Sequence, residues 1–321
     1  MKVGLIGLGR HGERYAKHLL SSQTPAQLVA ICRRDPAKGR TYAQEHQIRF
    51  HQDYQSLIHD PDVEAIIIVT PPSITYRIAI EAIQHRKSVL IEKPLAVSAA
   101  DARGIVECAA HANVPIMTAQ TLRYEPAIAA LKDRAHEVGK WHYLSLTARL
   151  ERRPHSLEEI NAWNGRGALL EIGIHLLDLA RFLTGEDIHE VHCEGPHMDT
   201  SQPEDHVWGR LTTQSGLPCL LDISRVSHSR TTRVELIGET GQLRANWSTA
   251  TLSLQRERHL PEQQTFVPTP TIYSVLKGFI HSLKTGNPMP ITGEDGLRAV
   301  EMAEACYESL ATGQAVRLRP V

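Results

Sequence analysis

An apolar segment at 168–185, ALLEIGIHLLDLARFLTG, carries three polar side chains whose spacing could do chemistry. Glu171, His175 and Asp178 stand at i, i+4 and i+7, so at about 100° per residue they fall within about 60° of one another on a helical wheel. An imidazole that titrates near neutral pH is suited to take the proton of an alcohol while hydride leaves its carbon. A histidine in an apolar helix can also be a satisfied core residue, and Asp178 is better suited to tie the helix to a neighbouring loop.

Glu171 precedes His175 by one helical turn, and we expect its carboxylate to act on that histidine. A carboxylate in this place can fix the imidazole tautomer and stabilise the imidazolium, as the acid of a Ser-His-Asp triad does. The sequence leaves open whether Glu171 contacts His175 or the substrate.

A second group of residues, GLGRHG, has the G-x-G-x-x-G spacing of a dinucleotide-binding turn. The motif alone is weak, but here it follows an apolar strand at 2–7 and opens a helix at 12–20, which is the context that the motif requires. Glycines allow the tight turn and the close approach of a pyrophosphate to the helix N-terminus. The loop residues that we assign to the cofactor are Gly7, Gly9, Arg10, His11 and Gly12.

The second strand of such a fold usually ends in an acidic residue that binds the ribose 2′-hydroxyl. Here the sequence is ICRRDP, with Arg33 and Arg34 in that place. Because arginine can bind a 2′-phosphate in bidentate fashion, the sequence favours NADP slightly over NAD. Alternatively, both guanidinium groups are solvated, and either Asp35 or no residue takes the part of the missing acid.

The elements that must position these residues alternate between strand and helix up to about residue 120. Short continuous apolar strands separated by helices predict a parallel sheet that is covered on both faces, a doubly wound Rossmann fold. The expected strands are 2–7, 27–32, 48–52, 64–70, 88–93 and 115–120, with helices at 12–20, 35–46, 53–59, 73–86 and 98–112. Asp35 followed by Pro36 is a helix start signal.

After residue 120 the pattern changes to runs of strands without intervening helices, which predicts an α+β domain with a mostly antiparallel, open sheet. We therefore expect a dinucleotide-binding domain at 1–120 and a substrate-binding and oligomerisation domain at 121–321. The expected strands are 141–151, 189–195, 205–214, 218–227, 231–237, 242–247 and 250–257, with helices at 125–137, 168–184, 271–285 and 293–312.

The tripeptide EKP at 92–94 ends the fifth expected strand, and TPP at 70–72 ends the fourth. With the glycine motif before them and the Glu171/His175 helix some 80 residues further on, the whole chain resembles the glucose–fructose oxidoreductase, inositol dehydrogenase and rhizopine-catabolism (Gfo/Idh/MocA) family. The resemblance implies NAD or NADP as cofactor. It also implies oxidation or reduction of a secondary hydroxyl on a sugar, a cyclitol or a nucleotide-linked sugar.

The resemblance also implies roles for individual residues. Lys93 would lie beside the nicotinamide and the substrate, where its charge can stabilise negative charge on oxygen, and its bond to Pro94 is commonly cis in the family. The family's Asp-x-x-x-His signature maps to Glu171 and His175, as catalytic and substrate-binding residues. Residues at the ends of the fourth and fifth strands join the cofactor site, namely Thr70, Pro71, Glu92 and Lys93.

The sequence departs from the family pattern in three places. Glu171 replaces the usual Asp and is one methylene longer, Tyr76 stands where a His often follows the fourth strand, and the usual Gly before the fifth strand is absent. The first two departures could change the choice of substrate.

Substrate contacts are expected between the first long strand and the Glu171/His175 helix, in ARLERRPHSLEEINAWNGRG at 148–167. Arginines there could bind an anionic substrate, and Trp163 and Asn164 could pack on and hydrogen-bond to a sugar ring. The alternative is an exposed strand edge with solvated arginines. The arginine candidates are Arg149, Arg152 and Arg153, and Arg123 in LRYEPA is a further candidate for the substrate site.

The composition excludes several other classes of protein. The formal net charge is −1, which gives no electrostatic footprint for nucleic acid or an anionic membrane. The five cysteines lack metal-ligand spacing, so we expect no metal and buried free thiols, as in a reducing cytoplasm. The apolar run at the N-terminus is too short for a signal peptide, and no run approaches the length of a membrane span.

The first hypothesis is therefore a cytoplasmic NAD(P)-dependent dehydrogenase that forms a homo-oligomer, dimer or tetramer, through its open sheet. A second is a redox-assisted glycoside-cleaving or epimerising enzyme that retains its nicotinamide. A third is a non-catalytic NAD(P) sensor, which would have little reason to keep Lys93, Glu171 and His175 together.

Overall fold

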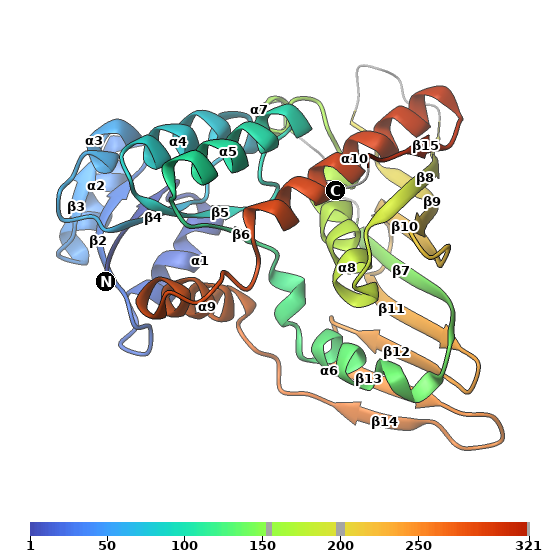
Figure 1. Cartoon of the computed structure of the whole chain (residues 1–321). Coiled ribbons are helices and arrows are strands. Elements are labelled where there is room, and N and C mark those ends of the chain that lie inside the picture. The colour runs from blue at the N-terminus through green and yellow to red at the C-terminus, as the bar shows by residue number, and fades with distance from the viewer. Residues whose placement is uncertain (152–155, 197–202, 320–321) are drawn as a thin grey trace. The chain divides into compact units, whose positions relative to one another are not determined.

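The computed structural model describes residues 1–151, 156–196 and 203–319. The chain forms two compact units, each of which collects segments distant in sequence (Figure 1). The first unit comprises Met1–Gln120 and Pro270–Leu297, and the second comprises Thr121–Thr269 and Arg298–Val321. The first boundary lies at the residue where the sequence pattern changes, but the sequence did not indicate that Pro270–Leu297 joins the first unit.

The first unit contains the predicted parallel sheet. Its strand order within the described residues is β3-β2-β1-β4-β5-β6, and all of its pairs are parallel. Every residue of β4 is buried, as expected for a central strand with helices on both faces. The strands are β1 (Lys2–Ile6), β2 (Gln27–Cys32), β3 (Arg49–His51), β4 (Ala65–Ile68), β5 (Ser88–Glu92) and β6 (Ile116–Ala119).

Helices cover both faces of this sheet, α4 and α5 on one face and α1 with α9 on the other (Figure 1). The predicted start of α2 at Asp35 is confirmed, because the Asp35 side chain accepts a hydrogen bond from the Lys38 N–H at 3.1 Å. The helices are α1 (Arg10–Leu19), α2 (Pro36–Glu45), α3 (Tyr54–Ile58), α4 (Pro72–Gln84), α5 (Ala99–Ala112) and α9 (Thr271–Thr285).

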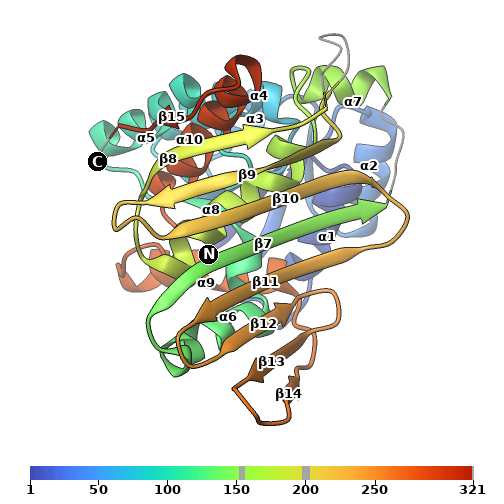
Figure 2. The same cartoon turned by 90° about the vertical axis from the view of Figure 1, so that its right-hand side faces the viewer.

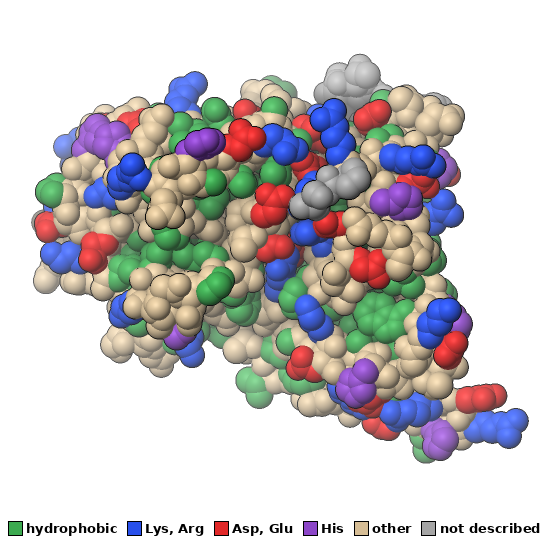
Figure 3. Space-filling view, viewed as in Figure 1, with side chains coloured by type: hydrophobic (Ala, Val, Ile, Leu, Met, Phe, Trp, Pro, Cys, Tyr) green, Lys and Arg blue, Asp and Glu red, His purple; other side chains and the backbone are tan. Residues whose placement is uncertain are grey.

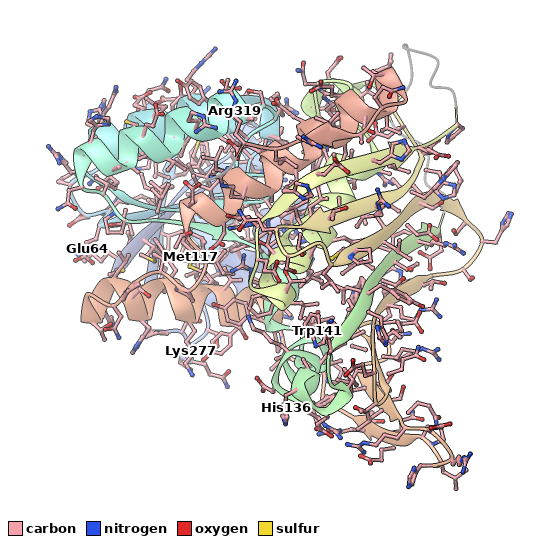
Figure 4. All side chains as sticks on the ribbon, turned by 45° about the vertical axis from the view of Figure 1, so that its right-hand side comes forward. Glu64, Met117, His136, Trp141, Lys277 and Arg319 are labelled. Carbon is pink, nitrogen blue, oxygen red and sulfur yellow. The ribbon has the colours of Figure 1, made fainter. Side chains whose placement is uncertain are left out.

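Helix α9 is joined to the first unit by packing and by backbone contacts. It buries Ile272 and Phe279, while Lys277 points away from the sheet (Figure 4). Beyond the helix, Thr292 forms an antiparallel bridge with Met117 of β6. The return of the chain therefore completes one face of the first unit.

The second unit is an α+β domain, as predicted. Within the described residues its sheet has nine strands in the order β14-β13-β12-β11-β7-β10-β9-β8-β15, and β7–β10 is a parallel pair in a mostly antiparallel sheet. The strands are β7 (Trp141–Glu151), β8 (Ile188–Glu194), β9 (His206–Thr213), β10 (Pro218–Ser227), β11 (Thr231–Gly238), β12 (Gln242–Asn246), β13 (Thr251–Gln255), β14 (Glu262–Thr265) and β15 (Val316–Arg317).

The helices of the second unit pack on one face of this sheet, and α6 and α8 lie behind it in Figure 2. The helical segments are η1 (Thr121–Tyr124), α6 (Pro126–Arg134), η2 (Ala135–Val138), α7 (Leu157–Ala162), η3 (Leu169–Gly173) and α8 (Ile174–Thr184), and α10 (Gly293–Thr312) passes from the first unit into the second. Strand residues alternate between the covered face and an open face, which carries exposed Tyr143, Trp208 and Leu220.

The surface of the molecule agrees with its balanced charge. On the face shown in Figure 3, positive and negative side chains are interspersed. The thiols of Cys32 and Cys219 are free and buried, as predicted. Within the described ranges, no helix combines the length and the apolar character that crossing a bilayer requires.

Candidate active site

The glycine loop between β1 and α1 is tightly packed except above Gly9. Gly7 has a φ of +100°, and a Cβ on it would lie 2.3 Å from the Val69 carbonyl oxygen. A Cβ on Gly12 would lie 2.0 Å from the Gly7 oxygen, whereas a Cβ on Gly9 would meet nothing within 4 Å. The open space at Gly9 adjoins the first-turn N–H groups of α1, which have no acceptor within the helix. This arrangement fits a pyrophosphate at the helix N-terminus.

His11 and Tyr15 of α1 connect this loop to the EKP segment. His11 Nε2 lies 2.7 Å from Glu92 Oε1, and the Tyr15 hydroxyl donates to the same oxygen at 2.7 Å. Burial alone would raise the pKa of Glu92, but the hydrogen bond from His11 and the charges of His11 and Lys93 lower it below its ordinary value. Glu92 is therefore a fixed negative charge beside Lys93.

Lys93 follows β5 at the carboxyl edge of the parallel sheet, where α/β folds bind their ligands. Strand β5 lies between β4 and β6. The peptide bond between Lys93 and Pro94 is cis, which confirms that expectation. The fourth-strand candidates lie at the same edge: Thr70 is 3.2 Å from the Thr75 hydroxyl, and Pro71 precedes α4.

Tyr76, which stands where the family often has a His, packs on the next helix of the first unit. A Cβ on Gly104 of α5 would lie 3.1 Å from the Tyr76 ring. The tyrosine is 39% exposed, so part of its ring remains accessible. Glycine at position 104 provides the room for this contact.

The arginines after β2 have different surroundings. Arg33 donates to Glu13 of α1 at 3.0 Å, whereas Arg34 is exposed. A cavity of about 320 Å³ lies beside this pair, and its walls include Arg33, Lys38 and Tyr42. A 2′-phosphate would have to compete with Glu13 for Arg33.

In the second unit, Glu171 and His175 lie on one helical segment, but its first turn is not α-helical. Residues Leu169–Gly173 form a π turn with i→i+5 hydrogen bonds, and α8 continues from Ile174. The sequence predicted a continuous α-helix over 168–184. The difference matters because π turns change which side chains share a face and occur often at functional sites.

A buried carboxylate, Glu204, holds the start of this helix. It accepts hydrogen bonds from the N–H groups of Gly167 and Leu169 at 2.8 and 3.0 Å, and from the Tyr307 hydroxyl at 2.7 Å. Burial raises the pKa of Glu204, and these hydrogen bonds offset the effect only in part. Glu204 therefore supplies the cap that the apolar start of the segment lacks.

Glu171 forms an ion pair with Arg225 of β10. The Arg225 side chain is 5% exposed and that of Glu171 is 22% exposed. Sequence reasoning missed Arg225, although a signal was present: it continues the two-residue alternation of Cys219, Leu221 and Ile223, all buried. An arginine in register with the apolar face of a strand needs a partner. His175 is half-buried, with its Nδ1 atom fully buried.

Asp178 is bound to Arg123. The Arg123 guanidinium donates to both carboxylate oxygens at 2.8 and 2.6 Å, and the two side chains are 10% and 1% exposed. The same guanidinium lies over the Phe182 ring at 5.0 Å. This pair ties α8 to η1, the structural role expected of Asp178. A substrate contact by Arg123 would have to share its guanidinium with Asp178.

The other substrate candidates have different surroundings. Arg149 pairs with Asp222 on the open face of the sheet, opposite to the face that α8 covers. Trp163 is half-buried just after α7, and Asn164 is exposed with a φ of +54°. Arg152 and Arg153 lie outside the described residues.

Two family models match this chain, one in each of its two main parts. Residues 1–120 match the family described as "Oxidoreductase family, NAD-binding Rossmann fold", and residues 133–244 match the "GFO/IDH/MocA C-terminal domain". The chain is 30% identical to scyllo-inositol 2-dehydrogenase (NAD(+)) of Bacillus subtilis, over 76% of this chain and 73% of that protein. It is 28% identical to myo-inositol 2-dehydrogenase of Thermotoga maritima, over 100% and 99% of the two chains.

A solved structure gives the same result for the fold. The crystal structure of a probable dehydrogenase from Thermotoga maritima superposes with a TM-score of 0.85 at 26% identity. The match covers 99% of this chain and 98% of that one.

Proposed function

The chain belongs to the Gfo/Idh/MocA family of oxidoreductases, and we propose that it oxidises or reduces a secondary alcohol of a cyclitol, a sugar or a nucleotide-linked sugar. Two of its relatives are dehydrogenases of inositols, which supports a cyclitol or a similar polyol as the substrate. The observation that carries the proposal is His175, half-buried on a helix whose other residues are mostly apolar, with Glu171 at i−4.

The proposed chemistry needs a proton acceptor and a positive charge from the protein. NAD or NADP, when bound, supplies the hydride acceptor. His175 takes the hydroxyl proton of the substrate as the C–H bond gives up its hydride, and the carbonyl forms. The ammonium group of Lys93 stabilises the negative charge that develops on the reacting oxygen.

The residues of the glycine loop would hold the dinucleotide. The first-turn N–H groups at Arg10 and His11 would bind the pyrophosphate, and Gly9 would leave room for it. Arg33 and Arg34 support NADP as the preferred cofactor, with NAD as the alternative, because a guanidinium can bind a 2′-phosphate in bidentate fashion. Arg33 would exchange its hydrogen bond to Glu13 for that contact.

A substrate panel tests the proposal. Myo-inositol, scyllo-inositol, common aldoses and UDP-sugars are each incubated with NAD⁺ and with NADP⁺, and reduced nicotinamide is measured by its absorbance. We expect turnover with at least one polyol, and its loss in Lys93→Met. Turnover without added dinucleotide would instead identify the internally recycling enzyme, and dinucleotide binding without turnover of any substrate would contradict the proposal.

A further inference from the structure

We propose that Arg225 is a positioning residue for the proposed active site: it holds the carboxylate of Glu171 in a buried ion pair, so that Glu171 presents little net negative charge to His175. This inference rests on the proposed role of His175 as the base. Under this proposal, strand β10 contributes to the active site through Arg225.

The ion pair joins two elements of the second unit, strand β10 and the π turn η3. Arg225 lies on the covered face of β10, in register with buried Leu221 and Ile223, and its Nη1 contacts Glu171 Oε2 on the π turn η3. Both side chains have little access to water, at 5% for Arg225 and 22% for Glu171. The charges of a pair with so little solvent are screened less than those of an exposed pair.

The backbone brings these two residues together at a point of close packing. A Cβ on Gly173 would lie 2.6 Å from Ile223 Cδ1, so a glycine lets the π turn approach β10 closely. The pairing of β10 with β7 shifts register between Ser224 and Ser227, and the Arg225 N–H donates to the Asp205 carbonyl at 2.8 Å. The strand is thus fixed at Arg225 on both its side-chain and its backbone groups.

The charge of Arg225 has a direct consequence for a base one turn from Glu171. A carboxylate near an imidazole favours the protonated form, and a protonated imidazole cannot accept a proton from the substrate. When the carboxylate is matched by a guanidinium, this bias is largely cancelled. Arg225 therefore limits the bias toward the protonated form that the Glu171 carboxylate would place on His175.

The other charged side chains near α8 also have partners. The face of β7 against α8 is apolar, with Leu144, Leu146 and Ala148. Asp178 is paired with Arg123, and Arg181 with Asp187 at 2.6 Å. Lys132 of α6 donates to the Phe182 carbonyl at 2.6 Å. Glu171 stands four residues before His175. Of the pairs named here around α8, we therefore assign the effect on His175 to Glu171–Arg225.

The first test removes the cation. Arg225→Met should leave the charge of Glu171 facing His175 and raise the pKa of His175 by about one unit. The pKa is measured by NMR titration of imidazole C–H signals in the full-length protein without ligand, and the His175 signal is identified by its loss in His175→Gln. Arg225→Lys keeps the charge and should give a smaller shift. A folded Arg225→Met protein with an unchanged His175 pKa would overturn the proposal.

The second test removes the carboxylate of Glu171. Its result can be interpreted even if the Arg225→Met protein does not fold. Glu171→Gln leaves the guanidinium charge alone and should lower the pKa of His175, while Arg225→Met combined with Glu171→Gln should bring it back near the wild-type value. Arg181→Met is the matched control, because it removes an arginine from α8, the helix that carries His175, and should leave the His175 pKa unchanged. Shifts of the same sign in both single variants would refute the charge balance.

These measurements separate the inference from the proposed function. The pKa of His175 is obtained without substrate, so a failed substrate panel does not affect it. If the panel finds a substrate, the pH profile of kcat/KM should move to higher pH in Arg225→Met by the same amount as the pKa. A profile that stays in place while the pKa moves would mean that His175 is not the base.

Discussion

At the residue scale, Lys93 is proposed to stabilise the negative charge that develops on the reacting oxygen. Lys93→Met removes the cation and nearly preserves the size of the side chain, so we expect turnover to fall by about 100-fold or more. The affinity for the dinucleotide should change only a few-fold, as measured by fluorescence titration. Lys17→Met, on the exposed side of α1, is the control, and equal effects of the two changes would contradict a catalytic role.

His175 is the proposed base. His175→Ala should lower kcat by roughly 100- to 10,000-fold, the range for loss of a general base. It should also remove the limb of the pH–rate profile that reports a group titrating near neutrality. Rates measured from mildly acidic to mildly alkaline pH check both effects. A variant that is slow but keeps the wild-type profile would show that another group accepts the proton.

Arg33 offers a test of cofactor choice. Arg33→Asp removes the partner of a 2′-phosphate and supplies a carboxylate for a 2′-hydroxyl, so kcat/KM should shift from NADP toward NAD. We expect a change of about tenfold or more in the ratio of the two values, since a charged contact of this kind contributes at least about 1.4 kcal/mol. Arg40→Asp on the exposed side of α2 is the control. An unchanged ratio would refute the 2′-phosphate interpretation.

Many residues of the candidate site could be proposed from sequence because their signal is local. GLGRHG, EKP and the Glu171/His175 spacing are short patterns within one or two elements. Arg225 could not be assigned in this way, because its partner lies on a distant segment of the chain. The same is true of Arg149, whose side chain lies on the open face of β7, a consequence of sheet register that the sequence alone did not reveal.

At the element scale, the start of the Glu171/His175 helix depends on one buried carboxylate. Glu204→Gln exchanges one accepting oxygen for an NH₂ group, so a buried N–H of Gly167 or Leu169 loses its acceptor. We expect a loss of about 1–3 kcal/mol in the free energy of unfolding, measured with urea. Glu194→Gln, on the exposed end of β8, is the control and should change stability little.

The pH dependence of this effect has a definite sign. Burial raises the pKa of Glu204 in the folded protein, so its contribution to stability is fully present below the unfolded pKa and is lost as pH rises through the folded pKa. The stability advantage of the wild type over Glu204→Gln should therefore be greater in mild acid than at neutral pH. An advantage that grows toward neutral pH would contradict this account.

Elements with strong periodicity were predictable, and those without it were not. The six parallel strands and the long strand β7 stand out because their apolar residues must meet a helix or a second layer. Strand β14 has the sequence EQQT and all four of its residues are exposed, so no alternation of apolar and polar residues predicts it. The π turn could not be predicted either. A helical wheel assumes 3.6 residues per turn, and the π turn has a different spacing.

At the scale of the whole molecule, the open face of the second sheet is the expected site of self-association. Its exposed apolar side chains include Tyr143 at 36%, Trp208 at 39% and Leu220 at 42%. Leu220 pairs with Ser145 and Arg210, so it lies within the face and not at its rim. Large exposed apolar groups on an open sheet face favour association with a second copy.

Leu220→Glu tests this expectation. We expect light scattering after size-exclusion chromatography to report an oligomer for the wild type and a smaller species for the variant, because the change replaces an apolar contact of the interface with a charge that must lose its hydration. Leu260→Glu changes the same residue type at a position that is 91% exposed and should not alter the mass. A monomeric wild-type protein would contradict the prediction of a homo-oligomer.

The discontinuity of the first unit affects how the protein is made. Strand β6 ends at Ala119, whereas α9, which packs on α1 and β6, begins only at Thr271. A ribosome thus completes the nucleotide-binding sheet long before it supplies the helix that covers one of its faces. Throughout synthesis of the intervening segment, the apolar surface later buried by Ile272 and Phe279 is open to chaperones and to other nascent chains.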